Sequence, residues 1–279
     1  MSRVWIVTGC STGIGRAIAE YLLEEGHRVA VTARKITDVA DLETRYPDQA
    51  LAIALDVTRD EQVRDAIAAT IARFGTVDAL VNNAGYGYVS SIEEGEIGSI
   101  QAMFDTNLFG ALRMMQAVLP HMRAQHSGLI VNISSLAGRI ANPATGFYAS
   151  SKHALEAMSE AASREVEPFG IRVCAVAPGM FRSEFSGRSL KSGNNPIGDY
   201  ADTVHQRIEL VRSADGRQPG DPRKLAAMVM ALADMDDPPR QLVAGPDAYA
   251  AIIARTDEIR TAMERHRTLS VSTDFDAPQ

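Results

Sequence analysis

The sequence is poor in cysteine, with only Cys10 and Cys174 among 279 residues. Both lie in or beside apolar, strand-like runs, so we expect reduced, buried thiols rather than disulfides, metal ligands or nucleophiles. The chain also lacks a dense block of Lys and Arg, and its formal net charge is −7. Nucleic acids and anionic membranes require a concentrated basic surface, so we expect neither as a partner. The histidines form no ligand cluster, and no metal is expected.

Long apolar runs are missing as well. No stretch of about 18 uncharged apolar residues could span a bilayer, and no basic segment followed by an apolar run and a small-residue cleavage site indicates secretion. We therefore expect a cytoplasmic protein. Because 46% of the residues are apolar, the chain can still bury a substantial core.

What the chain does contain is a regular alternation of apolar runs and amphipathic segments. Within Asp60–Phe74, for example, Val63, Ile67 and Ile71 share one helical face. The runs predict strands at residues 4–8, 28–32, 51–55, 79–82, 129–134, 172–177 and 241–244. This pattern is typical of an α/β fold: a single doubly wound parallel sheet of about seven strands with helices on both faces. We expect residues 1–279 to form one domain.

The order weakens after residue 183. Segment 184–220 is rich in Gly, Asn and Pro and is too long for a passive connection, so we expect a substrate loop or lid there. Asp221 and Pro222 then suit the N-cap and the first position of a helix. A C-terminal helical extension is expected at 246–267, followed by a frayed polar tail at 269–279.

Three glycines, Gly9, Gly13 and Gly15, separate the first predicted strand from the first helix. A phosphate can lie there against free backbone amides at the positive end of the helix, because glycine has no Cβ to keep it away. A glycine trio can also be a plain strand-to-helix turn. The order of strand, turn, helix and second strand favours a dinucleotide site.

The spacing G-x-x-x-G-x-G, preceded by Thr8, resembles the short-chain dehydrogenase/reductase family. Further motifs follow in that family's order over roughly residues 3 to 183, namely Asp56-Val57, Asn82-Asn83-Ala84-Gly85, Ser135, Tyr148 with Lys152, and Pro178-Gly179. The resemblance implies a Rossmann-like sheet, a nicotinamide cofactor and hydride transfer between a small-molecule alcohol and a carbonyl.

The charge after the second strand favours NADP over NAD. Ala33 stands where the family's NAD users carry aspartate, and Arg34 supplies a cation for a 2′-phosphate; alternatively, Arg34 and Lys35 only solvate a loop. By resemblance, Asp56 binds the adenine edge and Ser183 contacts the nicotinamide carboxamide. The predicted cofactor residues are Gly9, Ser11, Thr12, Gly13, Ile14, Gly15, Arg34, Asp56, Val57, Asn83, Ala84, Gly85, Tyr148, Lys152, Pro178, Gly179 and Ser183.

Hydride transfer to a ketone requires a proton donor and stabilisation of the developing negative charge on oxygen. Tyr148 is the candidate acid and base, but its reference pKa is about 10. Lys152, four residues on, shares its helical face and should lower that pKa. The resemblance adds Ser135 to hold the substrate oxygen and Asn107 to hold a water leading from Lys152 to solvent. Taken singly, each of these residues also has an ordinary structural role open to it.

Several features remain open at this stage. Phe181, Phe185, Leu190, Tyr86 and Tyr88 could line an apolar substrate pocket or simply pack in the core. The long final segment resembles the hydroxysteroid- and retinol-dehydrogenase-like branch, in which a homodimer through residues 100–122 and 149–168 is expected and a tetramer is in doubt. The alternatives are a nucleotide-sugar epimerase or dehydratase, and a non-catalytic NADP-sensing regulator on the same fold.

Overall fold

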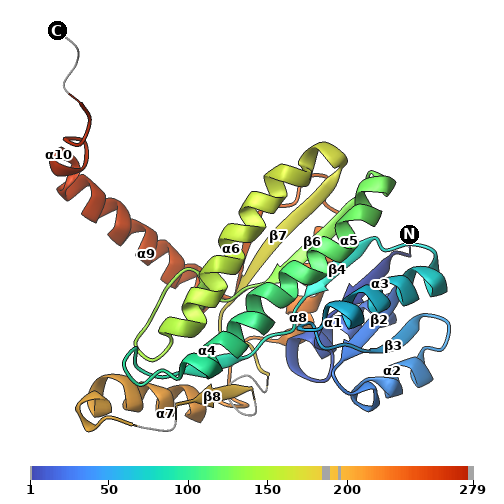
Figure 1. Ribbon diagram of the computed structural model, residues 1–279, viewed down its shortest axis with the longest axis horizontal. Coiled ribbons are helices and arrows are strands. Elements are labelled where there is room, and N and C mark those ends of the chain that lie inside the picture. The colour runs from blue at the N-terminus through green and yellow to red at the C-terminus, as the bar shows by residue number, and fades with distance from the viewer. Residues whose placement is uncertain (1, 184–188, 194–195, 276–279) are drawn as a thin grey trace.

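A seven-stranded parallel sheet forms the centre of the computed structural model, which describes residues 2–183, 189–193 and 196–275 (Figure 1). The strand order is β3-β2-β1-β4-β6-β7-β9. The strands are β1 (Val4–Val7), β2 (Arg28–Ala33), β3 (Ala50–Ala54), β4 (Ala79–Asn82), β6 (Gly128–Ile133), β7 (Ile171–Pro178) and β9 (Gln241–Ala244). All seven predicted strands are confirmed, as is the doubly wound fold class.

Helices cover both faces of this sheet, and each covering layer buries its own apolar cluster. Because side chains alternate along a strand, Trp5 and Val7 face one layer while Ile6 faces the other. The first layer contains α1 (Gly13–Glu24), α2 (Ala40–Arg45) and α8 (Pro222–Leu232). The second contains α3 (Asp60–Phe74), α5 (Ala111–Gln125) and α6 (Gly146–Val166). The predicted bounds of α3 are confirmed.

Short elements follow the carboxyl ends of the strands. They are the 3-10 turns η1 (Ile36–Asp38) and η3 (Leu136–Gly138), helix α4 (Ile97–Phe104) and the π-helical turn η2 (Asp105–Gly110). A further 3-10 turn, η4 (Glu167–Phe169), connects α6 to the start of β7. Because parallel strands share one carboxyl edge, most of these turns and loops meet on the same side of the sheet. This edge carries the residues that the sequence singled out.

A small parallel ribbon stands apart from the main sheet. Strand β5 (Gly87–Val89) pairs with β8 (Leu190–Ser192), which belongs to the expected substrate segment. Within the described part of that segment, β8 is followed by η5 (Gly198–Tyr200), the π-helical turn η6 (Ala201–His205) and α7 (Gln206–Ser213). Two distant parts of the chain are thereby joined beside the carboxyl edge.

The chain ends in an arm that leaves the body of the molecule (Figure 1). Helix α9 (Pro246–Arg265) is followed by α10 (Arg267–Ser270), with an interruption at His266. Before it, Asp221 caps α8 by accepting from the Arg223 backbone N–H at 2.8 Å, with Pro222 at the first position, as predicted. No helix in the described ranges is long and apolar enough to cross a membrane.

Candidate active site

The glycine turn between β1 and α1 leaves almost no room for side chains. Gly9 and Gly13 adopt φ values of 73° and 62°, a region that favours glycine. A Cβ on Gly15 would lie 2.3 Å from Asn83 Nδ2 and 2.4 Å from the Gly9 carbonyl oxygen. Thr12, the N-cap residue of α1, makes no side-chain capping bond to the described part of the helix, and the first turn of α1 carries no acidic residue. A bare, electropositive helix end of this kind fits a diphosphate.

The turn after β4 is fastened to this glycine turn. The Thr8 hydroxyl accepts from the backbone N–H groups of Asn83 and Ala84 at 2.9 and 3.0 Å. The Asn83 amide in turn donates to the carbonyl oxygens of Thr8 and Gly9 at 2.8 and 3.1 Å. The side chain of Asn83 is therefore committed to the backbone, and residues 83–85 border the cofactor region through their main chain.

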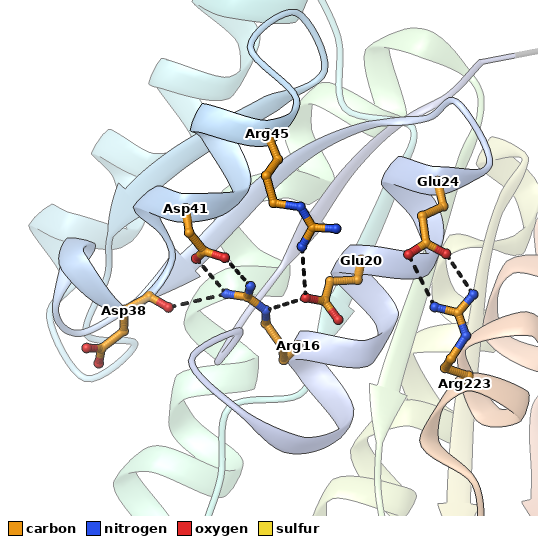
Figure 2. Close-up of polar contacts among 7 residues, drawn as sticks. All are labelled: Arg16, Glu20, Glu24, Asp38, Asp41, Arg45 and Arg223. Atoms are coloured by element: carbon orange, nitrogen blue, oxygen red, sulfur yellow. Dashed lines mark hydrogen bonds and ion pairs between the residues drawn. The ribbon is translucent and has the colours of Figure 1, made fainter.

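Arg16, just after the glycines, is neutralised by its neighbours (Figure 2). Its guanidinium pairs with both oxygens of Asp41 and donates to Glu20 at 2.9 Å. These bonds raise the pKa of Arg16, with Asp41 the main cause, and Arg16 lowers the pKa of Asp41 in return. This cation thus ties α1 to α2.

Arg34 presents a contrasting case. It is exposed directly after β2, and in the part of the chain that the structure describes it forms no ion pair. Burial would raise the pKa of Asp56, but the bonds from Thr58 and the charge of Arg34 lower it. Burial raises the pKa of Tyr86, and Arg34 partly opposes this rise. Asp56, the predicted adenine ligand, accepts from the Thr58 hydroxyl at 2.7 Å and from its backbone N–H at 3.0 Å. Next to it, the buried Val57 side chain faces Gly110, so only the main chain of Val57 could face a cofactor.

Tyr148 and Ser135 come together above the carboxyl ends of β6 and β7. Ser135 caps η3, accepting from the Ala137 N–H at 3.1 Å, and hydrogen bonds with Tyr148. Tyr148, in the first turn of α6, is 8% exposed. Burial raises the pKa of Tyr148 to about 12, although the Ser135 hydrogen bond lowers it in part. The lowering of this pKa by Lys152 that the sequence predicted is therefore not seen, because burial dominates.

Lys152 points along the same face of α6 as expected, but its closest partner is the main chain. Its Nζ donates to the Ile133 carbonyl oxygen at the end of β6 at 2.8 Å and lies 6.0 Å from the centre of the Tyr148 ring. Burial lowers the pKa of Lys152 to about 8, while the carboxylate of Glu156 partly opposes this. A Cβ on Gly85 would lie 3.6 Å from Nζ, so the amine reaches the predicted ribose region.

Asn107 lies on the π-helical turn η2, a type of turn that is frequent at functional sites. Its amide donates to the Tyr86 carbonyl at 2.9 Å and to Ser151 Oγ at 3.2 Å, and its Oδ1 accepts from the Tyr86 N–H at 3.0 Å. The side chain thus fixes the backbone beside Gly85, which is the ordinary role left open above. Its role in holding a water stays a prediction.

The far wall of the region follows β7. A Cβ on Gly13 would lie 3.1 Å from the Ser183 Cβ, so Ser183 stands across from the glycine turn. Its contact with the nicotinamide carboxamide stays a prediction. The intervening turn is held by Asp247, whose carboxylate accepts from the Met180 N–H at 2.8 Å and leaves no room for a side chain on Gly179. Ser11, Thr12 and Ile14, half-buried along the turn and the start of α1, and Pro178, the last residue of β7, complete the set that the sequence predicted at this edge.

The expected apolar pocket is only partly present. Tyr88 is 1% exposed and packs beside Phe147, so it belongs to the core. Leu190 packs in a separate cluster with Val204 and Ile208, and Phe185 lies outside the described residues. Tyr86 and Phe147 remain half-buried against the cluster that contains Tyr148. Phe181 packs against Gly220 and the core instead.

Sequence reasoning missed Glu94, in the turn after β5. Its side chain is 4% exposed and lies beside a cavity of about 340 Å³ between the β5–β8 ribbon and α7. The spacing Ser91-x-x-Glu94 was the available signal, because a serine and a glutamate three residues apart often bond each other's backbone. They do so here, at 3.1 Å in both directions.

The parallel sheet and its bare glycine turn define a nucleotide-binding α/β protein. The chain matches the short chain dehydrogenase family over residues 3–192, so it belongs to that family and is an oxidoreductase. A short-chain dehydrogenase from Streptomyces avermitilis is 39% identical with a TM-score of 0.92, and the match covers 99% of this chain and 100% of that one.

Two other relatives carry more informative names. The 3-ketodihydrosphingosine reductase of Bacteroides thetaiotaomicron is 35% identical over 88% of each chain. The gluconate 5-dehydrogenase of Burkholderia cenocepacia, solved with NADP and tartrate, is 29% identical with a TM-score of 0.75 over 90% of this chain and 96% of that one. The hydroxysteroid- and retinol-dehydrogenase-like branch stays a prediction.

Proposed function

We propose that this protein is an NADP(H)-dependent oxidoreductase that interconverts a carbonyl compound and the corresponding secondary alcohol. The observation that carries the proposal is the meeting of the Tyr148–Ser135 pair, the buried Lys152 amine and the bare glycine turn at one edge of one sheet. The substrate has an apolar body, since Tyr86 and Phe147 offer half-buried aromatic surface beside Tyr148. The relative that reduces a 3-keto sphingoid base supports such a substrate.

In this proposal the residues divide the chemistry between them. The bound nicotinamide supplies or accepts the hydride. Tyr148, whose pKa of about 12 keeps it protonated at neutral pH, donates its phenolic proton to the carbonyl oxygen during reduction. Ser135 holds that oxygen beside the phenol, and Lys152 stabilises the resulting phenolate by its positive charge. In alcohol oxidation the same proton returns to Tyr148.

The preference for NADP rests on the two arginines. Arg16 already pairs with two carboxylates, whereas Arg34 is exposed and lies next to the predicted adenine ligand Asp56. A 2′-phosphate would find this cation at the end of β2 and no carboxylate at Ala33 to repel it. The NADP complex of the gluconate 5-dehydrogenase is consistent with this choice.

The substitution Tyr148→Phe tests the catalytic assignment. Without the phenolic proton, NADPH oxidation by a panel of ketones and aldehydes should fall by about 10³-fold, as expected for the loss of a general acid. NADPH affinity, measured by fluorescence titration, should change little. Tyr46→Phe, at the C-cap of α2, is the control and should leave the rate unchanged.

Equal rates for the wild type and Tyr148→Phe would remove the catalytic assignment. Tight NADPH binding by the wild type without turnover of any substrate would favour the cofactor sensor. Turnover of a nucleotide sugar with no net change in NADPH would favour the epimerase.

The substitution Arg34→Ala tests the cofactor. It should raise the Kd for NADPH by roughly 10- to 100-fold, the worth of a charge-assisted bond to phosphate, and leave the Kd for NADH nearly unchanged. Arg73→Ala, another surface arginine, is the matched control and should affect neither. If Arg34→Ala weakens both cofactors alike, the 2′-phosphate assignment is wrong.

A further inference from the structure

The turn at residues 91–96 lies between the candidate catalytic helix and the substrate segment. On one side it packs against the start of α6: a Cβ on Gly95 would lie 2.3 Å from the Phe147 ring, and a Cβ on Gly146 would lie 2.9 Å from Ile92. Phe147 immediately precedes Tyr148. The position of this turn is therefore coupled directly to the beginning of the helix that carries the phenol.

On its other side the same turn holds residues 196–213, which we call the cap. The Glu94 Oε1 atom accepts from the Ile197 N–H at 2.6 Å and pairs with His205 Nε2 at 2.7 Å. Tyr200 donates to the neighbouring Glu93 at 2.7 Å. These contacts join positions about a hundred residues apart in sequence, so they fix tertiary structure rather than local structure.

Among these contacts, those of Glu94 are the most buried. Its side chain is 4% exposed, and its other oxygen accepts from the Ser91 N–H at 3.1 Å. Burial alone would raise the pKa of Glu94, but the bonds from Ile197, Ser91 and His205 outweigh it and hold this pKa at about 2. The carboxylate is thus fully charged at neutral pH and engaged at both oxygens, with donors from the turn and from both ends of the unit formed by η5 and η6.

We propose that Glu94 is a positioning residue for the reaction: through Ile197 and His205 it holds the cap at a fixed place relative to Phe147 and Tyr148, and so sets the affinity for the carbonyl substrate. This inference rests on the proposed function. It assigns Glu94 no contact with the reacting atoms. Its effect should therefore fall on substrate binding and leave the cofactor turn, which the contacts of Glu94 described above do not reach, unchanged.

The test compares Glu94→Gln with Glu93→Gln in the full chain. The amide cannot accept at both ends, so Glu94→Gln should raise the KM for a reducible ketone about tenfold, with kcat within about threefold and the NADPH Kd within about twofold. Glu93→Gln alters the bond that Tyr200 donates to an exposed carboxylate, so this variant should raise KM less than twofold. A purely structural loss would instead lower kcat and weaken NADPH together.

A double-mutant cycle identifies the partner. If Glu94 acts through His205, the double variant Glu94→Gln/His205→Ala should raise KM by less than the product of the two single effects. Multiplicative effects, or a KM that Glu94→Gln leaves unchanged, would overturn the proposal.

Hydrogen exchange provides a readout that does not need turnover. In Glu94→Gln, amides of α7 should exchange faster while those of β6 remain protected. Unchanged exchange in α7 would contradict the proposal even if no substrate is found, whereas failure of the proposed function would appear separately, as equal rates for the wild type and Tyr148→Phe.

Discussion

Helices α1 and α9 begin in the same way, but their first turns differ in charge. Each follows a strand of the sheet across a glycine with positive φ, Gly9 or Gly245, and each starts at the carboxyl edge. The first turn of α1 contains no acidic residue, whereas that of α9 contains Asp247, which bonds the turn after β7. The strand-turn-helix geometry alone therefore does not make a phosphate site; the helix end must also be free of its own carboxylate.

The two helices differ equally in how they are held. Five residues of α1 are buried, and its charged side chains are tied to α2 through Arg16 and to α8 through Glu24 and Arg223 (Figure 2). In α9 only Ala248 is buried, and its ion pairs link neighbours on the arm itself. Packing stabilises the first helix, and the second depends on local pairs that contribute little.

Among the substitutions that test this comparison, Gly15→Ala should have the largest effect on cofactor binding and stability. The new methyl group would collide with the Gly9 carbonyl and with the Asn83 amide that holds the turn. We expect NADPH binding to be lost, with a loss of stability of several kcal/mol. Calorimetric titration and thermal unfolding provide the two measurements.

The matched control is Gly98→Ala in α4, where a methyl group meets nothing within 4 Å. It should be neutral or should stabilise by up to about 1 kcal/mol, because alanine favours a helix. If Gly15→Ala binds NADPH as the wild type does, the turn does not hold the diphosphate.

A smaller effect on stability should distinguish the substitution of Arg16, on α1, from that of Arg267, on the C-terminal arm. Arg16→Ala removes the ion-pair partner of Asp41 and leaves Glu20 with Arg45 at 3.5 Å, so it should lower the free energy of unfolding by about 1 to 2 kcal/mol. Arg267→Ala removes only a 3.9 Å pair with Glu264 between exposed side chains, so it should change stability by less than about 0.5 kcal/mol. Denaturant titration would measure both; equal losses would mean that the arm is held as firmly as α1.

The main sheet was predictable because buried parallel strands appear as unbroken apolar runs. Every run from residues 4–8 to 241–244 became a strand of the sheet. The order of motifs along the chain predicted the position of the glycine turn and the proximity of Tyr148 and Ser135. Strands β5 and β8 were not predictable, because each has three residues and they pair across about a hundred positions.

The electrostatics of the site could not be predicted from spacing. The four-residue interval between Tyr148 and Lys152 placed both on one face correctly, but it gave no measure of burial, which raises one pKa and lowers the other. Glu94 was missed for a related reason: its partners Ile197 and His205 become neighbours only in the folded chain.

The bond from Lys152 to the Ile133 carbonyl has a consequence for engineering. Strand β6 lies inside the sheet between β4 and β7, so the amine is anchored to an interior strand rather than to a loop. Segments grafted from a homologue in place of the residues after β7 would leave that reference point where it is. To direct this protein toward new ketones, one would therefore exchange the loops after β7 and keep Tyr148 and Lys152 unchanged.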